Sequence, residues 1–172
     1  MGGADKGLAD HGGRPLVASA IERLAPQVGN LLINANRNLD AYRVWGHDLV
    51  SDFQPDSFAG PLAGLQAGLA ACTTPWLVSV PCDAPRFPLD LVNRLQAGLA
   101  GGDACYVVTA SGTQAVFLLC RHSLSASLDS FLTAGHRKVH DWLTTIDARS
   151  VYFDDESAFA NLNMPEDLTR GQ

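Results

Sequence analysis

The sequence predicts an α/β fold of three layers, in which a mostly parallel central sheet carries helices on both faces. Short apolar runs alternate with segments of helical periodicity through the first two thirds of the chain, and this alternation is typical of parallel α/β sheets. The runs are continuously apolar and do not alternate with polar residues, as is expected of strands that helices cover on both sides.

Each element follows from one of two patterns. In residues 15–28, Leu16, Ala20 and Leu24 recur at helical spacing and Pro15 suits a helix start, which predicts the first helix. By the same spacing, further helices are expected at 39–45, 60–71, 88–100, 125–132 and 139–144, with a closing helical turn at 165–170. Short apolar runs bounded by turn-forming residues predict strands, and these are expected at 29–33, 47–50, 76–80, 105–109, 116–120 and 151–153.

Composition limits the classes of function. A length of 172 residues with 47% hydrophobic and 17% charged residues fits a single globular domain over residues 1–172. The net charge of −6, with only 12 Lys and Arg, argues against a nucleic-acid partner, because such proteins usually present a basic face. No apolar run approaches the ~18 residues of a membrane span, so we expect no membrane partner and no signal peptide. The four cysteines show no CxxC spacing, which indicates free thiols in a cytoplasmic protein.

Polar residues follow three consecutive expected strands. Asn34, Asp52 and Asp83 each stand directly after, or within three residues of, an apolar run. Because the carboxyl ends of parallel strands share one edge of a sheet, these side chains are expected to converge on one ligand site. Lys6, in a Gly-rich opening segment, adds a cation. Any one of these Asn or Asp residues could simply terminate its strand, but the three together favour a site.

The motifs around these residues resemble those of the molybdenum cofactor guanylyltransferases, the bacterial family that attaches GMP to molybdopterin. They run in the family's order across nearly the whole chain, and this order is more specific than any single motif. The motifs are Met1-Gly2-Gly3-Ala4-Asp5-Lys6-Gly7, Gly13-Arg14-Pro15-Leu16, Asn34-Ala35-Asn36-Arg37, Asp52, Gly60-Pro61-Leu62-Ala63-Gly64-Leu65, Pro81-Cys82-Asp83-Ala84-Pro85, Gly135-His136-Arg137-Lys138-Val139 and Asn161-Leu162-Asn163-Met164-Pro165-Glu166-Asp167-Leu168. The resemblance implies a Rossmann-type fold like that of the nucleotide-diphospho-sugar transferases.

The sequence departs from the family pattern at two places. Family members begin with a strand and a phosphate-binding loop of the form Leu-Ala-Gly-Gly-x-x-x-Arg-Met-Gly-Gly, and this sequence starts at the Met of that signature. We therefore expect the domain to lack its first strand, near the centre of the sheet. Ala115 stands where the family usually has Pro, in a segment that the family resemblance places toward molybdopterin.

The resemblance also implies the reaction and the residues that serve it. A phosphate of molybdopterin would attack the α-phosphorus of GTP, and pyrophosphate would leave. Asp83 would be the ligand of Mg²⁺, an ion that proteins hold through one or two carboxylates together with phosphate oxygens and water. Lys6 would face the triphosphate, so Lys6 and Asp83 are the expected catalytic residues. Asn34 and Asp52 would also bind GTP, with Asp52 on either the guanine or the ribose.

Molybdopterin is expected to meet a second group of residues, consisting of Arg137, Lys138, Asn161 and Asn163. For Arg137 and Lys138, a solvated basic start of a helix is an equal alternative. Transient contacts with molybdenum-insertion proteins and molybdoenzyme chaperones are expected from the family. Two other functions remain open: a related nucleotidyltransferase that uses cytidine or a sugar phosphate, and a non-catalytic cofactor-binding or adaptor protein.

Overall fold

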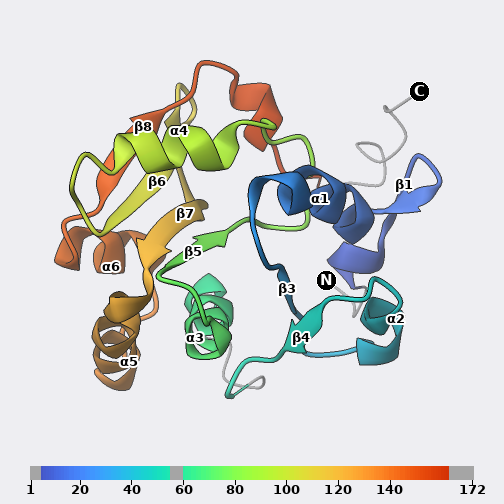
Figure 1. The fold of residues 1–172 in the computed structure, drawn as a ribbon, viewed down its shortest axis with the longest axis horizontal. Helices are drawn as coiled ribbons and strands as arrows, with labels where there is room; N and C mark the ends of the chain where they lie inside the picture. Colours follow the sequence, from blue (N-terminus) through green and yellow to red (C-terminus); the bar gives the residue numbers. More distant parts are fainter. Residues whose placement is uncertain (1–4, 55–59, 163–172) are drawn as a thin grey trace.

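The structure is a computed structural model that describes residues 5–54 and 60–162. The first half of the chain contains short strands and three helices around a small parallel pair (Figure 1). Its elements are the 3₁₀ turn η1 (Lys6–Leu8), β1 (Asp10–His11), β2 (Arg14–Pro15), α1 (Leu16–Leu24), η2 (Ala25–Gln27), β3 (Leu32–Asn34), α2 (Leu39–Arg43), β4 (Asp48–Val50) and α3 (Pro61–Ala71).

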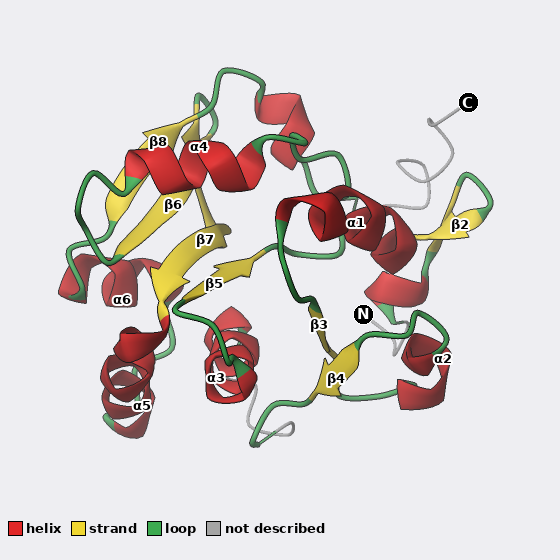
Figure 2. Ribbon diagram, viewed as in Figure 1, coloured by secondary structure: helices red, strands yellow, loops and turns green. Residues whose placement is uncertain are grey.

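The second half of the chain builds the larger sheet and the helices that cover it (Figure 2). Its elements are β5 (Trp76–Ser79), α4 (Leu91–Gly98), β6 (Ala104–Thr109), β7 (Gly112–Arg121), η4 (His122–Leu124), α5 (Ser125–Thr133), α6 (Val139–Thr145), β8 (Arg149–Tyr152) and η5 (Glu156–Phe159). The expected helix over 15–28 ends as an α-helix at Leu24 and continues as a 3₁₀ turn that contains Pro26. The expected helical turn at 165–170 lies outside the described residues.

The α/β class is confirmed, but the strand pairing is more mixed than expected. In the described residues, β3 and β4 form a parallel pair, and the larger sheet has the order β5-β7-β6-β8. Within that sheet only β6 and β8 are parallel, while β7 runs antiparallel to both of its neighbours. The cause is the short connection at residues 110–111, because Thr109 pairs with Gly112 in a hairpin, whereas a parallel pair needs a long crossover.

Helices cover both faces of the larger sheet, so the predicted three-layer arrangement is also confirmed. Successive residues of β7 point to opposite faces: Phe117 lies in the cluster under α4, and Leu118 lies in the cluster formed with α3, α5 and α6. Phe117 makes edge-to-face contacts with Phe87 and Phe159, at ring-centroid distances of 5.9 and 4.9 Å. This aromatic cluster anchors the segment after β5 and the end of the described chain on one face.

A hollow separates the β3–β4 pair from the larger sheet. In the described part of the chain, β3 pairs only with β4, and β5 pairs with no strand other than β7. Both strands line a cavity of about 700 Å³, together with residues of α1 and α3, so one edge of each sheet borders the same space. The lining of this hollow is apolar between the strands, where Leu32, Ile33, Leu77 and Val78 lie, and polar at one rim.

Candidate active site

The polar rim of the hollow is the candidate site. Asn34 ends β3, Asp52 follows β4, and Asp83 follows β5 in the turn after Pro81 and Cys82. All three line the hollow, and Asn161 from the end of the described chain lines it as well. The structure therefore brings together the three strand-end residues that the sequence singled out. They meet because β3, β4 and β5 end at the same rim of the hollow, although β5 belongs to a different sheet from β3 and β4.

Two amide side chains orient the carboxylate of Asp52. Asn34 Nδ2 donates to Asp52 Oδ1 at 3.0 Å, and Asn36 Nδ2 donates to Asp52 Oδ2 at 2.8 Å. Asn36 also accepts from the backbone N–H of Asp52 at 2.9 Å, so it holds this residue at two points. Sequence reasoning gave Asn36 no role, although its spacing of two from Asn34 on an extended segment is a signal that both side chains share one face.

Gly64 leaves space for the side chains of Asn34 and Asp52. A Cβ at Gly64 would lie 2.8 Å from Asn34 Oδ1 and 3.7 Å from Asp52 Oδ1, so a larger residue would push Asn34 away. Helix α3 begins at Pro61, after Gly60, whose φ of 66° lies in the left-handed region that favours glycine. Gly60 and Pro61 also line the hollow. The first turn of α3 thus brings the positive end of the helix dipole beside Asn34 and Asp52.

On the other side of the rim, Asp83 forms an ion pair with Lys6, which is not itself among the residues that line the hollow. Lys6 Nζ is 3.2 Å from Asp83 Oδ2, and the side chain of Lys6 is 56% exposed while that of Asp83 is 15% exposed. The backbone carbonyl of Asp83 accepts from the N–H of Leu162 at 2.7 Å, which ties the segment carrying Asn161 to the same turn. Burial, with smaller effects of Asp83 and Asp5, raises the pKa of the neighbouring Cys82 thiol to about 11. The thiol is therefore neutral near pH 7 and is no nucleophile.

The residues expected to meet molybdopterin divide into three outcomes. Asn161 lies on the rim, and Asn163 lies outside the described residues. Arg137 donates to the carbonyls of Leu132 and of His136, at 2.7 and 2.6 Å, and so caps the end of α5. Neither Arg137 nor Lys138 is among the residues that line the hollow. Both side chains are exposed just before α6, so contact with molybdopterin and the alternative, a solvated basic start of a helix, both stay predictions.

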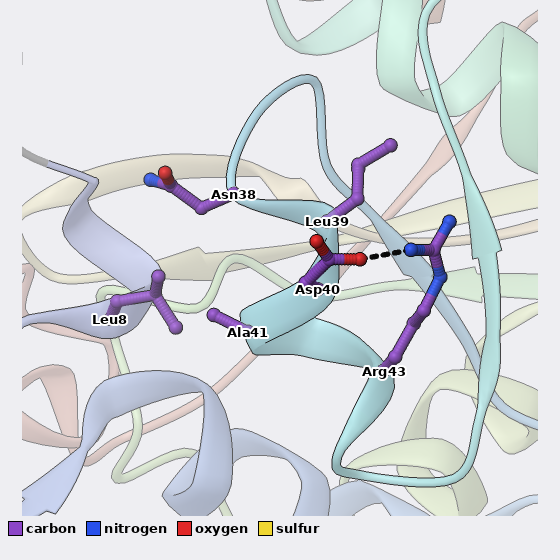
Figure 3. Close-up of a pocket in the computed structure, with 6 residues that line it drawn as sticks. All are labelled: Leu8, Asn38, Leu39, Asp40, Ala41 and Arg43. Carbon is purple, nitrogen blue, oxygen red and sulfur yellow. Dashed lines mark hydrogen bonds and ion pairs between the residues drawn. The ribbon is translucent and has the colours of Figure 1, made fainter.

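A second depression lies beside α2 and holds none of the predicted site residues (Figure 3). It is wide and open, with a volume of about 760 Å³, and an ion pair joins Asp40 to Arg43 on the surface of the helix. Its lining residues are Leu8, Asn38, Leu39, Asp40, Ala41 and Arg43. The rim of the hollow, with its converging carboxylates and amides, is therefore the better candidate for a ligand site.

Solved structures share this fold. Molybdopterin-guanine dinucleotide biosynthesis protein A from Archaeoglobus fulgidus superposes with a TM-score of 0.73 at 20% identity, over 96% of this chain and 88% of that one. The 2-C-methyl-D-erythritol 4-phosphate cytidylyltransferase from Thermus thermophilus gives a TM-score of 0.72 at 13% identity, over 95% and 90% of the two chains. The fold is thus that of the nucleotidyltransferases, and the polar rim lies at the strand ends where α/β folds bind ligands.

Curated sequences identify the family. Residues 1–149 match the model of the MobA-like NTP transferase domain. The molybdenum cofactor guanylyltransferase of Bordetella petrii is 49% identical over 174 residues, which cover 98% of this chain and 88% of that protein. The enzyme of the same name from Cupriavidus necator is 46% identical over 175 residues, with 98% and 87% covered. This chain belongs to the molybdenum cofactor guanylyltransferases, within the MobA-like NTP transferases, and the resemblance of its motifs is confirmed.

Two properties of the described residues bear on what the site could hold. Within residues 5–54 and 60–162, no three His, Cys, Asp or Glu side chains gather into a metal site. Within the same residues, no helix has the length and apolar character to cross a bilayer.

Proposed function

We propose that this protein transfers GMP from GTP to molybdenum-bound molybdopterin and releases pyrophosphate, which yields the guanine dinucleotide form of the molybdenum cofactor. The observation that carries the proposal is the convergence of Asn34, Asp52 and Asp83 on one rim of the hollow, in a chain whose curated relatives bear the name of this activity. Localisation in the cytoplasm, and transient contacts with molybdenum-insertion proteins and molybdoenzyme chaperones, belong to the same proposal.

The reaction needs little covalent help from the protein. A phosphate oxygen of molybdopterin forms a bond to the α-phosphorus of GTP, and the bond from that phosphorus to the oxygen bridging to the β-phosphate breaks. The electron pair leaves with pyrophosphate. A catalyst for such a step has to align the two substrates and offset negative charge on the phosphate oxygens. The rim supplies the ammonium of Lys6 and the carboxylate of Asp83 for these tasks.

Mg²⁺ is the metal that fits the residues present. Proteins hold this ion through one or two carboxylates, with phosphate oxygens and water completing the shell. Asp83 offers one partly exposed carboxylate at the rim, and the lack of a larger acidic cluster in the described residues agrees with a metal that arrives with the triphosphate. Bound there, Mg²⁺ would offset charge on the phosphate oxygens. The ammonium of Lys6, now 3.2 Å from Asp83, would then face the phosphates.

The two sides of the rim suit different parts of the reaction. Asn34 and Asp52 lie beside the first turn of α3, and they are proposed to bind the nucleoside of GTP. Amide and carboxylate oxygens accept from guanine N–H groups and from ribose hydroxyls alike. Asn161 lies on the side of Asp83 and is proposed to contact molybdopterin. Arg137 and Lys138 do not line the hollow, and their contact with molybdopterin stays a prediction.

Pyrophosphate release tests the proposed function. The protein is mixed with Mg²⁺, molybdopterin and one nucleoside triphosphate, and we expect release with GTP and little with CTP, ATP or UTP. Turnover with CTP would favour the alternative of a related nucleotidyltransferase that uses cytidine. Binding of GTP or molybdopterin without turnover would favour the non-catalytic cofactor-binding function.

A further inference from the structure

Asp5, the residue before Lys6, is the centre of a hydrogen-bonded cluster outside the predicted site. Its side chain is 13% exposed. Asp5 Oδ1 accepts from the backbone N–H of Gly7 at 3.2 Å and from the hydroxyl of Tyr42 at 2.6 Å. Asp5 Oδ2 accepts from Asn38 Nδ2 at 3.1 Å and lies 3.9 Å from Arg37 Nε. One carboxylate thus joins η1 to α2 and to the segment before it.

Close packing reinforces this junction. Tyr42 is 5% exposed and belongs to the small core cluster with Val17 and Ile33, so its ring is fixed by α1 and β3. A Cβ at Gly7 would lie 2.3 Å from the Tyr42 hydroxyl oxygen, which means that only glycine lets η1 approach α2 this closely. The hydrogen bond and the contact at Gly7 act on both sides of the same short turn. Lys6 lies between them in sequence.

We propose that Asp5 and Tyr42 are positioning residues that hold the backbone of η1 so that Lys6 faces Asp83 across the rim. The proposal rests on the proposed role of Lys6 toward the triphosphate. A lysine side chain that is half exposed has many rotamers, and its ammonium stays near one place only when the backbone that carries it is fixed. The bonds from the Tyr42 hydroxyl and the Gly7 N–H to Asp5, which we call the clamp, fix the backbone of η1. The ammonium of Lys6 can then pair with Asp83.

A purely electrostatic effect of Asp5 would have the opposite sign. The carboxylate carries a negative charge next to the place proposed for the triphosphate, so its charge alone would weaken the binding of GTP. By that account, Asp5→Asn would tighten GTP binding. The clamp predicts weaker binding in the same variant, because an amide is a poorer acceptor for the Tyr42 hydroxyl and the Gly7 N–H than a carboxylate.

A double-mutant cycle tests the clamp in the full chain. Affinities for Mg²⁺-GTP and for GMP are measured by calorimetry for the wild type, Tyr42→Phe, Lys6→Ala and the double variant. We expect Tyr42→Phe to weaken GTP binding about two- to tenfold, the effect of losing one hydrogen bond, to leave GMP binding unchanged, and to add nothing in the Lys6→Ala background. Tyr152→Phe is the matched control, because Tyr152 is 55% exposed on β8.

The outcomes separate the clamp from the proposed function. Equal weakening for GTP and GMP, or a full effect of Tyr42→Phe in the Lys6→Ala background, overturns the positioning role. If the wild type bound no GTP, the proposed function would fail, and the clamp would be decided by amide hydrogen exchange at Gly7, Leu8 and Ala9. Faster exchange there in Tyr42→Phe, with exchange in α3 unchanged, supports the clamp. Unchanged exchange at these amides overturns it.

Discussion

At the scale of single residues, the site depends on side chains that hold other side chains. Asp52 carries the carboxylate proposed to meet the nucleoside, but Asn36 sets its direction through two hydrogen bonds. A carboxylate held in this way binds a ligand without first losing its own rotamer freedom. A substitution at Asn36 is therefore expected to affect ligand binding although Asn36 is not proposed to touch the substrate.

We predict that Asn36→Ala weakens GTP binding about two- to tenfold, since each hydrogen bond that Asn36 makes contributes a net ~1 kcal/mol. The carboxylate of Asp52 keeps its bond from Asn34 but can rotate about it. The dissociation constant from calorimetry checks this prediction. Asn93→Ala, at an exposed position on α4, is the control. An unchanged affinity in Asn36→Ala would show that Asp52 needs no second partner.

Asp83→Asn should abolish guanylyl transfer and leave the fold intact. The change keeps the size of the side chain but removes the negative charge that Mg²⁺ requires, and we expect a loss of at least about 100-fold in turnover. The midpoint of thermal unfolding should move little, because the backbone carbonyl of Asp83 keeps its bond from Leu162 and the ion pair to Lys6, whose side chain is 56% exposed, adds little stability. Pyrophosphate release and circular dichroism measure the two expectations. Full activity would refute the proposed metal role.

At the scale of elements, the periodicity of the sequence predicted where the helices lie, but it did not predict which strands pair or in which direction. The spacing of Leu62, Leu65 and Leu69 was enough to locate α3, because these leucines are buried on one side of the helix. The direction of β7 was not predictable from its apolar run, since a strand reads the same in a parallel and an antiparallel pair. The irregular pairing after Tyr106, where the next partner in β7 moves from Leu118 to Gln114, left no mark in the composition either.

The candidate site shows the same division. Asn34, Asp52 and Asp83 could be predicted because strand ends share an edge, which is a rule of topology. The clamp at Asp5 could not, because its partner Tyr42 lies 37 residues away on α2 and only the folded chain brings them together. Motif resemblance carries no information about where a side chain points. It therefore did not reveal that Nη1 of Arg137 donates to the carbonyls of Leu132 and His136.

The buried thiols of the sheet predict how stability depends on pH. Burial between β6 and α4 raises the pKa of Cys105 from about 9 to about 12. The folded state then holds this proton at pH values where the unfolded state has released it, so the free energy of unfolding falls as pH rises from about 9 to 12. Urea unfolding at pH 8, 9, 10 and 11 measures the slope. Cys105→Ala should flatten it, and equal slopes in both proteins would contradict the prediction.

At the scale of the whole molecule, the hollow between β3 and β5 has the position that one further strand would occupy. A strand between β3 and β5 would pair with the edges that no described strand occupies and would cover Ile33, Leu77 and Val78. Burying such apolar surface and pairing both edges stabilises a sheet. We therefore predict that a strand and loop of the family form Leu-Ala-Gly-Gly-x-x-x-Arg, added before Met1, would fill this hollow.

We predict that the chain extended in this way melts at a higher temperature and turns over GTP faster than the chain that starts at Met1. Turnover should differ more than affinity, because the loop N–H groups would align the α-phosphorus. Melting curves with and without Mg²⁺-GTP, and pyrophosphate release, make the comparison. The control carries prolines in the added strand, which remove the N–H donors that pairing needs. Equal stability and activity with and without the extension would show that the hollow needs no strand.

The division into two sheets also has a consequence for the lifetime of the folded protein. Asp52 follows a strand of the small sheet, whereas Asp83 follows a strand of the large one. A nucleotide that binds both residues is a non-covalent cross-link, and it stabilises the folded chain by RT ln(1 + [L]/Kd). If GTP binds both residues as proposed, we expect the resistance of the folded chain to proteolysis to rise with the concentration of GTP.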